Sequence, residues 1–266
     1  NITEPATYDV EVNVADMTIS LKKHYDGFKA DCMLILGDAV KSGWDMSNSV
    51  AMLEGEPGVW TATVYLAADQ GFKFYAENDI FNGFQYRAAG EENVTLAEGA
   101  ATSLISSEVN RNDSKFQVAE AGNYVITCDL NAGTITVKKA DYQDNEIVYA
   151  ALWLVGDATE NGWDLEQPVV LAQDASNPMV YTATADLKEG ELQVVVNKFT
   201  SYNSDVYVSD ATDATKAVRV NKDSEKNNWK ITEAGKYDVK LNVLDNTMSI
   251  IKNVPSAISS VTTQAE

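Results

Sequence analysis

The chain has 266 residues, 45% of them hydrophobic, which is enough for two domains of ordinary size, each with its own core. Its formal net charge of −20 disfavours nucleic acid as a partner, because few cations are available to neutralise phosphates. The sequence contains no apolar run of about 18 residues and does not begin with a basic and apolar leader. If the protein has a signal peptide or an anchor, we expect it on a longer precursor.

The first 23 residues contain two alternating runs around a tight turn, Tyr8 to Val14 and Met17 to Lys23, which predict a β-hairpin. The same pattern returns at Glu120 to Lys139 and at Glu233 to Lys252, where each copy opens with Glu-Ala-Gly-x-Tyr. Since this hairpin closes each repeat, we expect residues 1–23 to be the closing hairpin of a truncated upstream module.

A second pattern occurs twice, at Met33 to Asp45 and at Leu152 to Asp164. Each copy has a short apolar run, a Gly-Asp-Ala turn and a Gly-Trp-Asp, which is typical of a buried strand that delivers an indole to a loop. Repetition at this length predicts tandem modules. The expected organisation is a module at 24–140, a polar linker at 141–146, a second module at 147–252 and a tail at 253–266.

Both repeats consist of short strands with turn signals, and no segment has a helical period over three turns. This pattern, with a tyrosine at a sheet corner in each closing hairpin, fits tandem immunoglobulin-like antiparallel β-sandwich domains, an all-β fold. The segment Phe81 to Arg87 is interpreted as a loop, because it is polar and interrupted by glycine. Besides the hairpins, the predicted strands are 32–36, 49–53, 59–66, 71–75 and 115–118, then 151–155, 169–172, 181–187, 191–197, 217–220 and 229–231.

The residues needed for catalysis or metal binding are scarce. We expect Cys32 and Cys128 to be separate buried thiols, since the second repeat has Ala151 and Leu241 in their places. The single histidine, His24, is expected in a capping or solvent-facing role, and one histidine with two cysteines cannot build a four-ligand zinc site. Phosphate-binding and calcium-binding loop motifs are absent. Although the many carboxylates leave a glycosidase-type pair open, we expect no enzyme, no metal and no cofactor.

Aromatic residues in the loops of the first repeat suggest a sugar site. A pyranose packs its C–H face on an aromatic plane while Lys, Arg and Asn side chains bind its hydroxyls. In an alternative interpretation, Phe81, Phe84 and Tyr86 fill the underside of a long loop. The candidate glycan-binding residues of this repeat are Trp44, Lys73, Phe84, Tyr86, Arg87 and Asn112.

The second repeat offers a thinner set. The lysine of Phe72-Lys73-Phe74 is replaced by Gln193 or Val194, depending on the register, so this repeat is predicted to have an altered or lost site. Trp229 occupies the position of Phe116 and is interpreted as a core residue. The candidate residues here are Trp163, Asn197, Lys198 and Tyr202, with Tyr207 as a further aromatic side chain.

Together the Gly-Asp-Ala to Trp stretches, the Gly-Phe-Lys-Phe segment and the Ala-Gly-x-Tyr hairpins resemble the SusE/SusF type of starch-binding outer-membrane lipoproteins. The resemblance covers nearly the whole chain. It implies a non-catalytic, lipid-anchored protein on the outer surface of the outer membrane, whose tandem modules capture polysaccharide for a neighbouring importer. It also implies binding residues that match Trp44, Lys73, Tyr86, Arg87 and Asn112, while the second repeat departs from the pattern at the Phe-Lys-Phe position.

Two alternatives to this interpretation remain. The modules could be structural or protein-interaction parts of the importer complex that bind no sugar, or accessory domains of a larger glycoside hydrolase. The expected partners are a polysaccharide or oligosaccharide and an outer-membrane importer, with no nucleic acid. Contact with a membrane is expected only through a lipid anchor that this chain does not contain.

Overall fold

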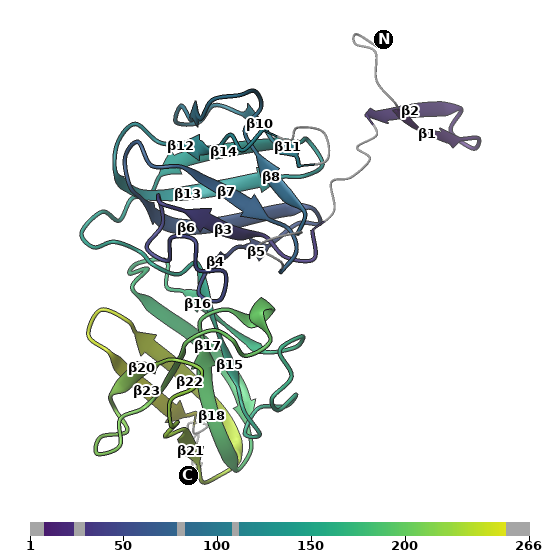
Figure 1. The fold of residues 1–266 in the computed structure, drawn as a ribbon. Helices are drawn as coiled ribbons and strands as arrows, with labels where there is room; N and C mark the ends of the chain where they lie inside the picture. The colour runs from purple at the N-terminus through teal and green to yellow at the C-terminus, as the bar shows by residue number, and fades with distance from the viewer. Residues whose placement is uncertain (1–7, 24–29, 79–82, 108–111, 254–266) are drawn as a thin grey trace, which may run out of the picture. The chain divides into compact units, whose positions relative to one another are not determined.

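The computed structural model describes residues 8–23, 30–78, 83–107 and 112–253 (Figure 1). His24 and Phe81 lie outside the described residues, so the roles predicted for them stay predictions. Apart from one short 3-10 helix, Lys198–Thr200, the regular structure of the described residues consists of β-strands, nearly all in antiparallel pairs. The predicted all-β antiparallel fold is therefore confirmed.

The chain divides into two compact units, Asn1–Ala150 and Ala151–Glu266, which are described separately below. The first contains an N-terminal hairpin, β1 (Tyr8–Asn13) and β2 (Thr18–Lys23), that pairs with no other described strand. One face of this hairpin carries four largely exposed apolar side chains, because facing pairs of an antiparallel ladder point to the same side. These four are Val10, Val12, Ile19 and Leu21.

The first unit then forms two sheets that pack face to face (Figure 1). One sheet has the order β10-β14-β13-β6-β5; the other has the order β11-β8-β7-β12-β9 and is extended by β3, which pairs with β7 and β4. Its strands are β3 (Leu34–Gly37), β4 (Val50–Ala51), β5 (Leu53–Glu54), β6 (Val59–Leu66), β7 (Phe72–Tyr75), β8 (Gln85–Arg87), β9 (Val94–Thr95), β10 (Thr102–Ser103), β11 (Ile105–Ser106), β12 (Phe116–Gln117), β13 (Gly122–Asp129) and β14 (Thr134–Lys139).

The core of the first unit lies between these sheets. Alternate residues of β6 and β13 point inward, as the period of two along a strand requires. Phe72, Phe74 and Phe116 meet at ring-centroid distances of 5.8 to 6.0 Å in edge and tilted arrangements. Cys32 and Cys128 are both buried free thiols, as predicted from the second repeat.

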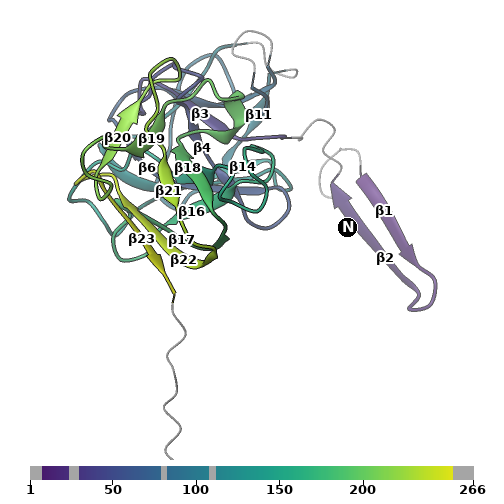
Figure 2. The same cartoon turned by 90° about the horizontal axis from the view of Figure 1, so that it is seen from below.

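In the second unit the strands pair in the order β20-β19-β18-β15-β16-β17-β22-β23, with β21 on β18 (Figure 2). Strand β16 pairs with β15 through Val169 to Ala172 and with β17 through Ala172 and Gln173. It therefore connects the strands that precede it in this order, β20 to β15, with those that follow it, β17 to β23. The first unit makes the same crossing with β4 and β5. The strands are β15 (Ala151–Val155), β16 (Val169–Gln173), β17 (Val180–Leu187), β18 (Gly190–Val195), β19 (Val206–Ser209), β20 (Ala217–Val220), β21 (Trp229–Ile231), β22 (Gly235–Asn242) and β23 (Thr247–Lys252).

The sequence interpretation missed two buried strands. Strand β8 lies within Phe81 to Arg87, which was interpreted as a loop, and that interpretation is wrong for Gln85–Arg87. Its polar side chains are buried because they bond within the fold: Arg87 Nη2 donates to Gln85 Oε1 at 2.7 Å. Strand β19 was also missed, although all four of its residues are buried.

The closing hairpins carry the tyrosine feature expected at a sheet corner. Tyr124 Oη donates to Glu120 O at 2.8 Å, and Tyr237 Oη donates to Glu233 O at 2.6 Å. Each bond returns to the backbone four residues upstream, as in the tyrosine corners of immunoglobulin-like sandwiches. The two units therefore close in the same way.

The polar segment predicted as a linker, 141–146, is hydrogen bonded to the first unit. Buried Asn123 donates through Nδ2 to Tyr142 O at 3.0 Å and to Asn145 O at 2.8 Å, and its Oδ1 accepts from Ile147 N at 2.9 Å. Ile147 O in turn accepts from Tyr65 N at 2.9 Å. Residues 141–147 thus form part of the fold of the first unit.

Candidate functional site

Equivalent turns present the two tryptophans of the repeated motif. Strand β3 ends at Gly37, whose N–H donates to Gly43 O at 2.9 Å; in the second unit Gly156 N donates to Gly162 O at the same distance. Each turn is followed at once by its tryptophan, Trp44 or Trp163. The difference between the two sites therefore comes from the side chains that surround the indoles.

Around Trp44 the neighbours are charged and paired with one another. Lys73 Nζ and Lys115 Nζ lie 5.5 and 5.7 Å from the centroid of the Trp44 ring, within the range of a cation–π interaction. Asp113 binds both ammonium groups, at 2.6 Å to Lys73 and 2.9 Å to Lys115. The indole N–H of Trp44 donates to Asp38 Oδ1 at 3.1 Å. We refer to Trp44, Lys73, Asp113 and Lys115 as the Trp44 cluster.

Burial and pairing compete within the Trp44 cluster. Burial lowers the pKa of Lys73, and the hydrogen bond from its ammonium group to Asp113 opposes this only in part. For Asp113, burial works to raise the pKa, but hydrogen bonds from Lys73 and Lys115 outweigh it and leave the pKa below its usual value. Both groups are thus held in their charged forms by each other.

Arg87 and Asn112, both predicted to bind sugar, interact with each other beside the cluster. Buried Arg87 donates through Nη1 to the main-chain O of Asn112 at 2.6 Å, while its Nε is buried without a hydrogen-bond partner. Asn112 Nδ2 donates to Gly90 O at 3.2 Å. The arginine therefore fixes a loop rather than projecting into solvent.

The predicted aromatic contacts Tyr86 and Phe84 pack inward. Tyr86 is fully buried on β8, and its ring meets that of Phe84 edge to face at a centroid distance of 5.2 Å. Phe84 is partly buried against the core of the first unit. The burial of Tyr86 agrees with the alternative interpretation, in which the rings pack beneath a loop, and leaves Trp44 and Phe84 as the partly exposed rings among the candidate residues of this unit.

Beside Trp163 the surface is hollowed. We call this site the Trp163 hollow; its volume is about 390 Å³. Trp163 and Tyr202 are 40% and 37% exposed, so two aromatic rings face solvent at one site. The residues that line the hollow are Trp163, Gln193, Tyr202, Val206, Lys222, Lys226 and Asn228.

Two amide side chains of the hollow have acceptors without partners. Gln193 is only 3% exposed, and its Oε1 is buried with no hydrogen bond. Asn228 Oδ1 is also buried and unbonded, although Asn228 Nδ2 donates to Glu191 Oε2 at 3.1 Å. A buried acceptor without a donor costs about 1–3 kcal/mol, and because both oxygens are buried a ligand recovers that energy only when the two amide side chains turn toward the hollow.

Donors lie around the hollow as well. Lys226 Nζ is held by the main-chain oxygens of Lys222 at 2.7 Å and Ser224 at 3.3 Å, and Lys222 Nζ pairs with Asp223 at 2.7 Å. The hydroxyl of Tyr202 donates to Trp163 O, which ties the two rings together. Tyr202 itself has a φ of +63°, a left-handed conformation that is uncommon for a bulky residue and recurs at functional sites.

Asn197 and Lys198, two further candidates, lie outside the lining of this hollow. Asn197 is fully buried and caps the short helix, where its Oδ1 accepts from Phe199 N at 2.9 Å. Lys198 Nζ lies 4.9 Å from the Phe199 ring, and burial lowers its pKa against the opposing charges of Glu166 and Asp164. The remaining aromatic residues, Tyr207 and Trp229, are buried, as was predicted for Trp229.

Sequence reasoning therefore missed Gln193, Asn228, Lys222 and Lys226 as a group. The strand register provides the missing signal: Leu36 pairs with Lys73, and Val155 pairs with Gln193, so Gln193 is the counterpart of Lys73. Phe116 and Trp229 likewise pair with matching residues, which makes Asn228 the counterpart of Lys115 and Lys226 that of Asp113. The second unit thus replaces two lysines with amides and the aspartate with a lysine.

The fold and site together define an all-β chain with an aromatic-walled hollow that carries unsatisfied acceptors. No family model matches the sequence, and no curated protein matches it. Among solved structures, the crystal structure of SusF from Bacteroides thetaiotaomicron matches with 12% sequence identity and a TM-score of 0.33. The match covers 92% of this chain and 52% of the SusF chain, so this chain spans about half the length of that one. This similarity is too low to assign the chain to a family.

Two further observations concern the described residues only. Within them, no group of three or more His, Cys, Asp or Glu side chains is arranged to hold a metal ion. Nor does this part of the chain contain a helix with the length and apolar character that crossing a membrane requires.

Proposed function

We propose that the protein is a non-catalytic carbohydrate-binding protein and that the Trp163 hollow is its glycan site. One observation carries the proposal: two exposed aromatic rings and two amide side chains, those of Gln193 and Asn228, line the same hollow. A sugar offers C–H faces for such rings and hydroxyl groups for such amides, whose unpaired oxygens become accessible when the side chains turn toward the hollow. Lys222 and Lys226 line the hollow too, and each ammonium group has an N–H beyond its present contacts for a sugar oxygen.

The motif resemblance to starch-binding outer-membrane lipoproteins supports a more specific form of this proposal. In this form, the protein captures a starch-like polysaccharide at the cell surface for an outer-membrane importer. A single hollow of about 390 Å³ accommodates a few sugar rings, so the affinity for a short oligosaccharide is weak, and repeated sites along a polysaccharide raise the apparent affinity.

Affinity electrophoresis tests the glycan site. Native gels containing starch, dextran, mannan or xylan should retard the wild-type chain in at least one case. The variants Trp163→Ala and Gln193→Leu should migrate as in a gel without polysaccharide, because the first removes a stacking surface and the second removes an acceptor. Val170→Ala, which changes an exposed residue of the same unit outside the hollow, should be retarded like the wild type. Normal mobility of the wild-type chain in every gel would contradict the proposal.

A further inference from the structure

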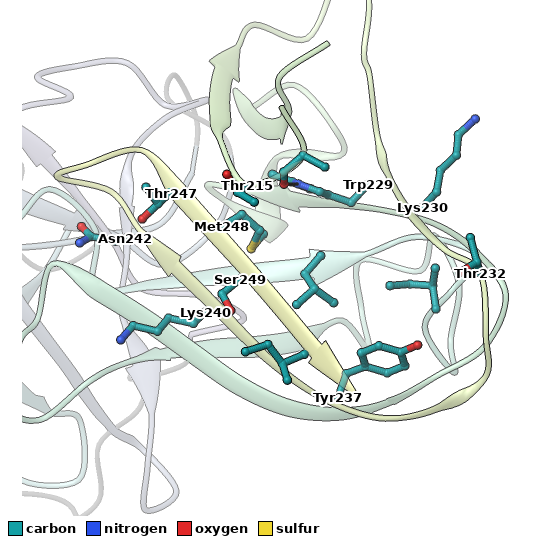
Figure 3. Close-up of a pocket in the computed structure, with 14 residues that line it drawn as sticks. Thr215, Trp229, Lys230, Thr232, Tyr237, Lys240, Asn242, Thr247, Met248 and Ser249 are labelled. Carbon is teal, nitrogen blue, oxygen red and sulfur yellow. Dashed lines mark hydrogen bonds between the residues drawn. The ribbon is translucent and has the colours of Figure 1, made fainter. Parts of the chain in front are cut away.

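A groove of about 1000 Å³ lies in the second unit between β21 and the β22–β23 hairpin, away from the residues of the Trp163 hollow. Its apolar lining includes Trp229, Ile231, Tyr237, Met248 and Ile250. Figure 3 shows Trp229 and Met248 close together, Tyr237 on β22 beside the far end of β23, and Lys230 pointing away from the other side chains. The groove is thus long, and two strands flank it.

The first unit has a corresponding groove, but a segment of its own chain fills most of it. There the corresponding space measures about 220 Å³, and its lining includes the matching residues Val118, Tyr124 and Val137. Leu96, which comes from the segment that contains β9 and β10, is only 5% exposed and also lines it. The difference in volume therefore corresponds to one segment of chain that lies along the groove in the first unit.

This segment is held as added β-structure. Strand β9 pairs in parallel with β12, and β10 pairs antiparallel with β14. Main-chain hydrogen bonds of 2.8 Å run from Val94 N to Lys115 O, from Leu96 N to Gln117 O and from Gly99 N to Val137 O. The segment thus satisfies both strand edges and inserts an apolar side chain between them.

The second unit keeps only the end of such a segment among its described residues, 151–253: Lys216 bridges Thr247 as Ser103 pairs with Thr134, and none of these residues lies along the groove as Val94 to Gly99 do in the first unit. In that part of the chain β21 pairs only with β18, and the outer edge of β23 has only the single bridge between Thr247 and Lys216. The hydrogen bonds between this edge and the main chain of 215–217 involve Asn246 and Met248. Among the described residues, the part of β23 beyond Met248 has no pairing strand on that side. Two open edges therefore face the groove, an arrangement that accepts an added strand.

We propose that this groove is a docking site for an extended segment of a partner protein with apolar side chains at alternate positions. The segment from Val94 to Ser103 shows the chemistry that fits, since it covers the equivalent groove in the same chain. In the first unit Glu98 Oε1 accepts from Lys139 N at 3.0 Å, and Lys252 has the position of Lys139. Because Lys240 also lines the groove, the docked segment carries an acidic residue among its apolar ones.

A synthetic peptide of residues 93–101 tests this proposal on the full chain. Isothermal titration calorimetry should detect binding, and amide hydrogen exchange should slow at Lys230 and Ile250, where new main-chain hydrogen bonds form. A peptide with Leu96→Asp should bind at least about tenfold more weakly, since it puts a charge in the apolar groove. The protein variant Ile250→Asp should weaken binding similarly, and Val170→Asp, on an exposed position outside the groove, should not.

Three results would overturn the proposal. The first is no binding of the peptide to the full chain or to a chain that ends at Asn253. The second is binding only to the shortened chain, which would identify residues 254–266 as the occupant of the groove. The third is a dimer in sedimentation equilibrium that Ile250→Asp converts to a monomer, which would identify a second copy of this protein as the partner. Because the peptide and the glycan bind at different residues, Trp163→Ala should leave peptide binding unchanged.

Discussion

Trp44 and Trp163 leave equivalent strands through equivalent turns, but they meet different side chains. In the Trp44 cluster two lysines face the indole and one aspartate pairs with both of them. Beside Trp163 the matching positions hold Gln193, Asn228 and Lys226, and two buried amide oxygens there have no partner. The same fold therefore places an ion-paired set of side chains beside one tryptophan and an amide-lined hollow beside the other.

The comparison reverses the order of importance that the sequence suggested. A lysine next to a tryptophan looks like a ligand-binding pair, yet here Lys73 is satisfied by Asp113, which follows it 40 positions along the chain. Its replacement by a glutamine looked like a lost site. Unsatisfied polarity at a concave aromatic surface is the better indicator of binding, because the ligand must supply what the fold does not.

The largest expected effect on stability concerns the glycine at which the equivalent turn of each site begins. Gly37 and Gly156 both have a φ of +144°, and an added Cβ would lie 2.1 Å from a backbone oxygen, that of Gly71 or of Glu191. Gly37→Ala and Gly156→Ala should each reduce the free energy of unfolding of their own unit by more than about 3 kcal/mol. Urea unfolding followed by tryptophan fluorescence measures this effect.

The matched control for these glycines is Gly43→Ala, at a φ of +58° with nothing within 4 Å of the added Cβ. It should cost about 1 kcal/mol, the strain of the left-handed conformation alone. If Gly37→Ala cost no more than this control, the close approach to Gly71 would not be essential for the turn.

The next effect separates the two tryptophans. Trp44→Ala removes the ring that two ammonium groups face and the hydrogen bond to Asp38, so it should destabilise the first unit by about 2 kcal/mol. Trp163→Ala removes a ring that is 40% exposed, so it should destabilise the second unit by less than Trp44→Ala destabilises the first. Differential scanning calorimetry of both variants compares them. Equal losses would show that Trp163 supports its loop as much as Trp44 does.

A smaller expected effect on stability tests the ion pairs of the Trp44 cluster. Asp113→Asn leaves the ammonium group of Lys73, whose side chain is 7% exposed, near Arg87 and Lys115 without this carboxylate. We expect a loss of about 1 kcal/mol in the free energy of unfolding, since the 61% exposure of Asp113 screens the pair. Asp223→Asn, which removes the exposed partner of Lys222, is the control and should change stability very little.

The pH dependence of this loss has a defined sign. The pKa of Asp113 is lower in the folded protein than its ordinary value of 3.8, so its contribution to stability is present above that value. The contribution disappears as the pH falls through the lower, folded pKa. The difference in stability between the wild type and Asp113→Asn, measured by urea unfolding at several pH values, should therefore shrink below pH 3.8. A difference that stayed constant there would remove Asp113 as its source.

The smallest expected effect on stability concerns a buried position where the two units have different residues. Cys32→Ala introduces the residue that the second unit has at Ala151, and it should cost less than about 1 kcal/mol. Burial, together with Asp31 and Glu77, raises the pKa of the Cys32 thiol to about 12. Both cysteines should therefore resist a thiol reagent at pH 8 until the protein is unfolded, and fast labelling of the native protein would contradict the buried position.

Local patterns predicted most of the fold. Alternation along β6 and β17 and the Tyr-bearing hairpins provided strands close to those observed, because one face of each is buried and the other is not. Strand β8 could not be predicted in this way. Its residues Gln85 and Arg87 are polar but buried, and they satisfy each other and the main chain of Asn112 only after the fold brings these groups together.

The site was less predictable than the fold for a related reason. Trp163 could be identified from its motif, and Tyr202 from its place in a polar loop. Gln193 and Asn228 come together only through the pairing of β18 with β21, which depends on strand register between residues 35 positions apart. That their acceptors have no partner is a property of the assembled hollow, so no sequence pattern could reveal it.

The hydrogen bonds of Asn123 determine where the folded first unit ends. The sequence repeat ends with the closing hairpin at Lys139, but the amide of Asn123 and the main chain of Tyr65 bind residues as far as Ile147. A recombinant fragment trimmed at the repeat boundary would leave Asn123 exposed and unpaired, whereas one that ends at Ala150 would keep every one of these bonds. The sequence repeat and the folded first unit therefore end at different residues.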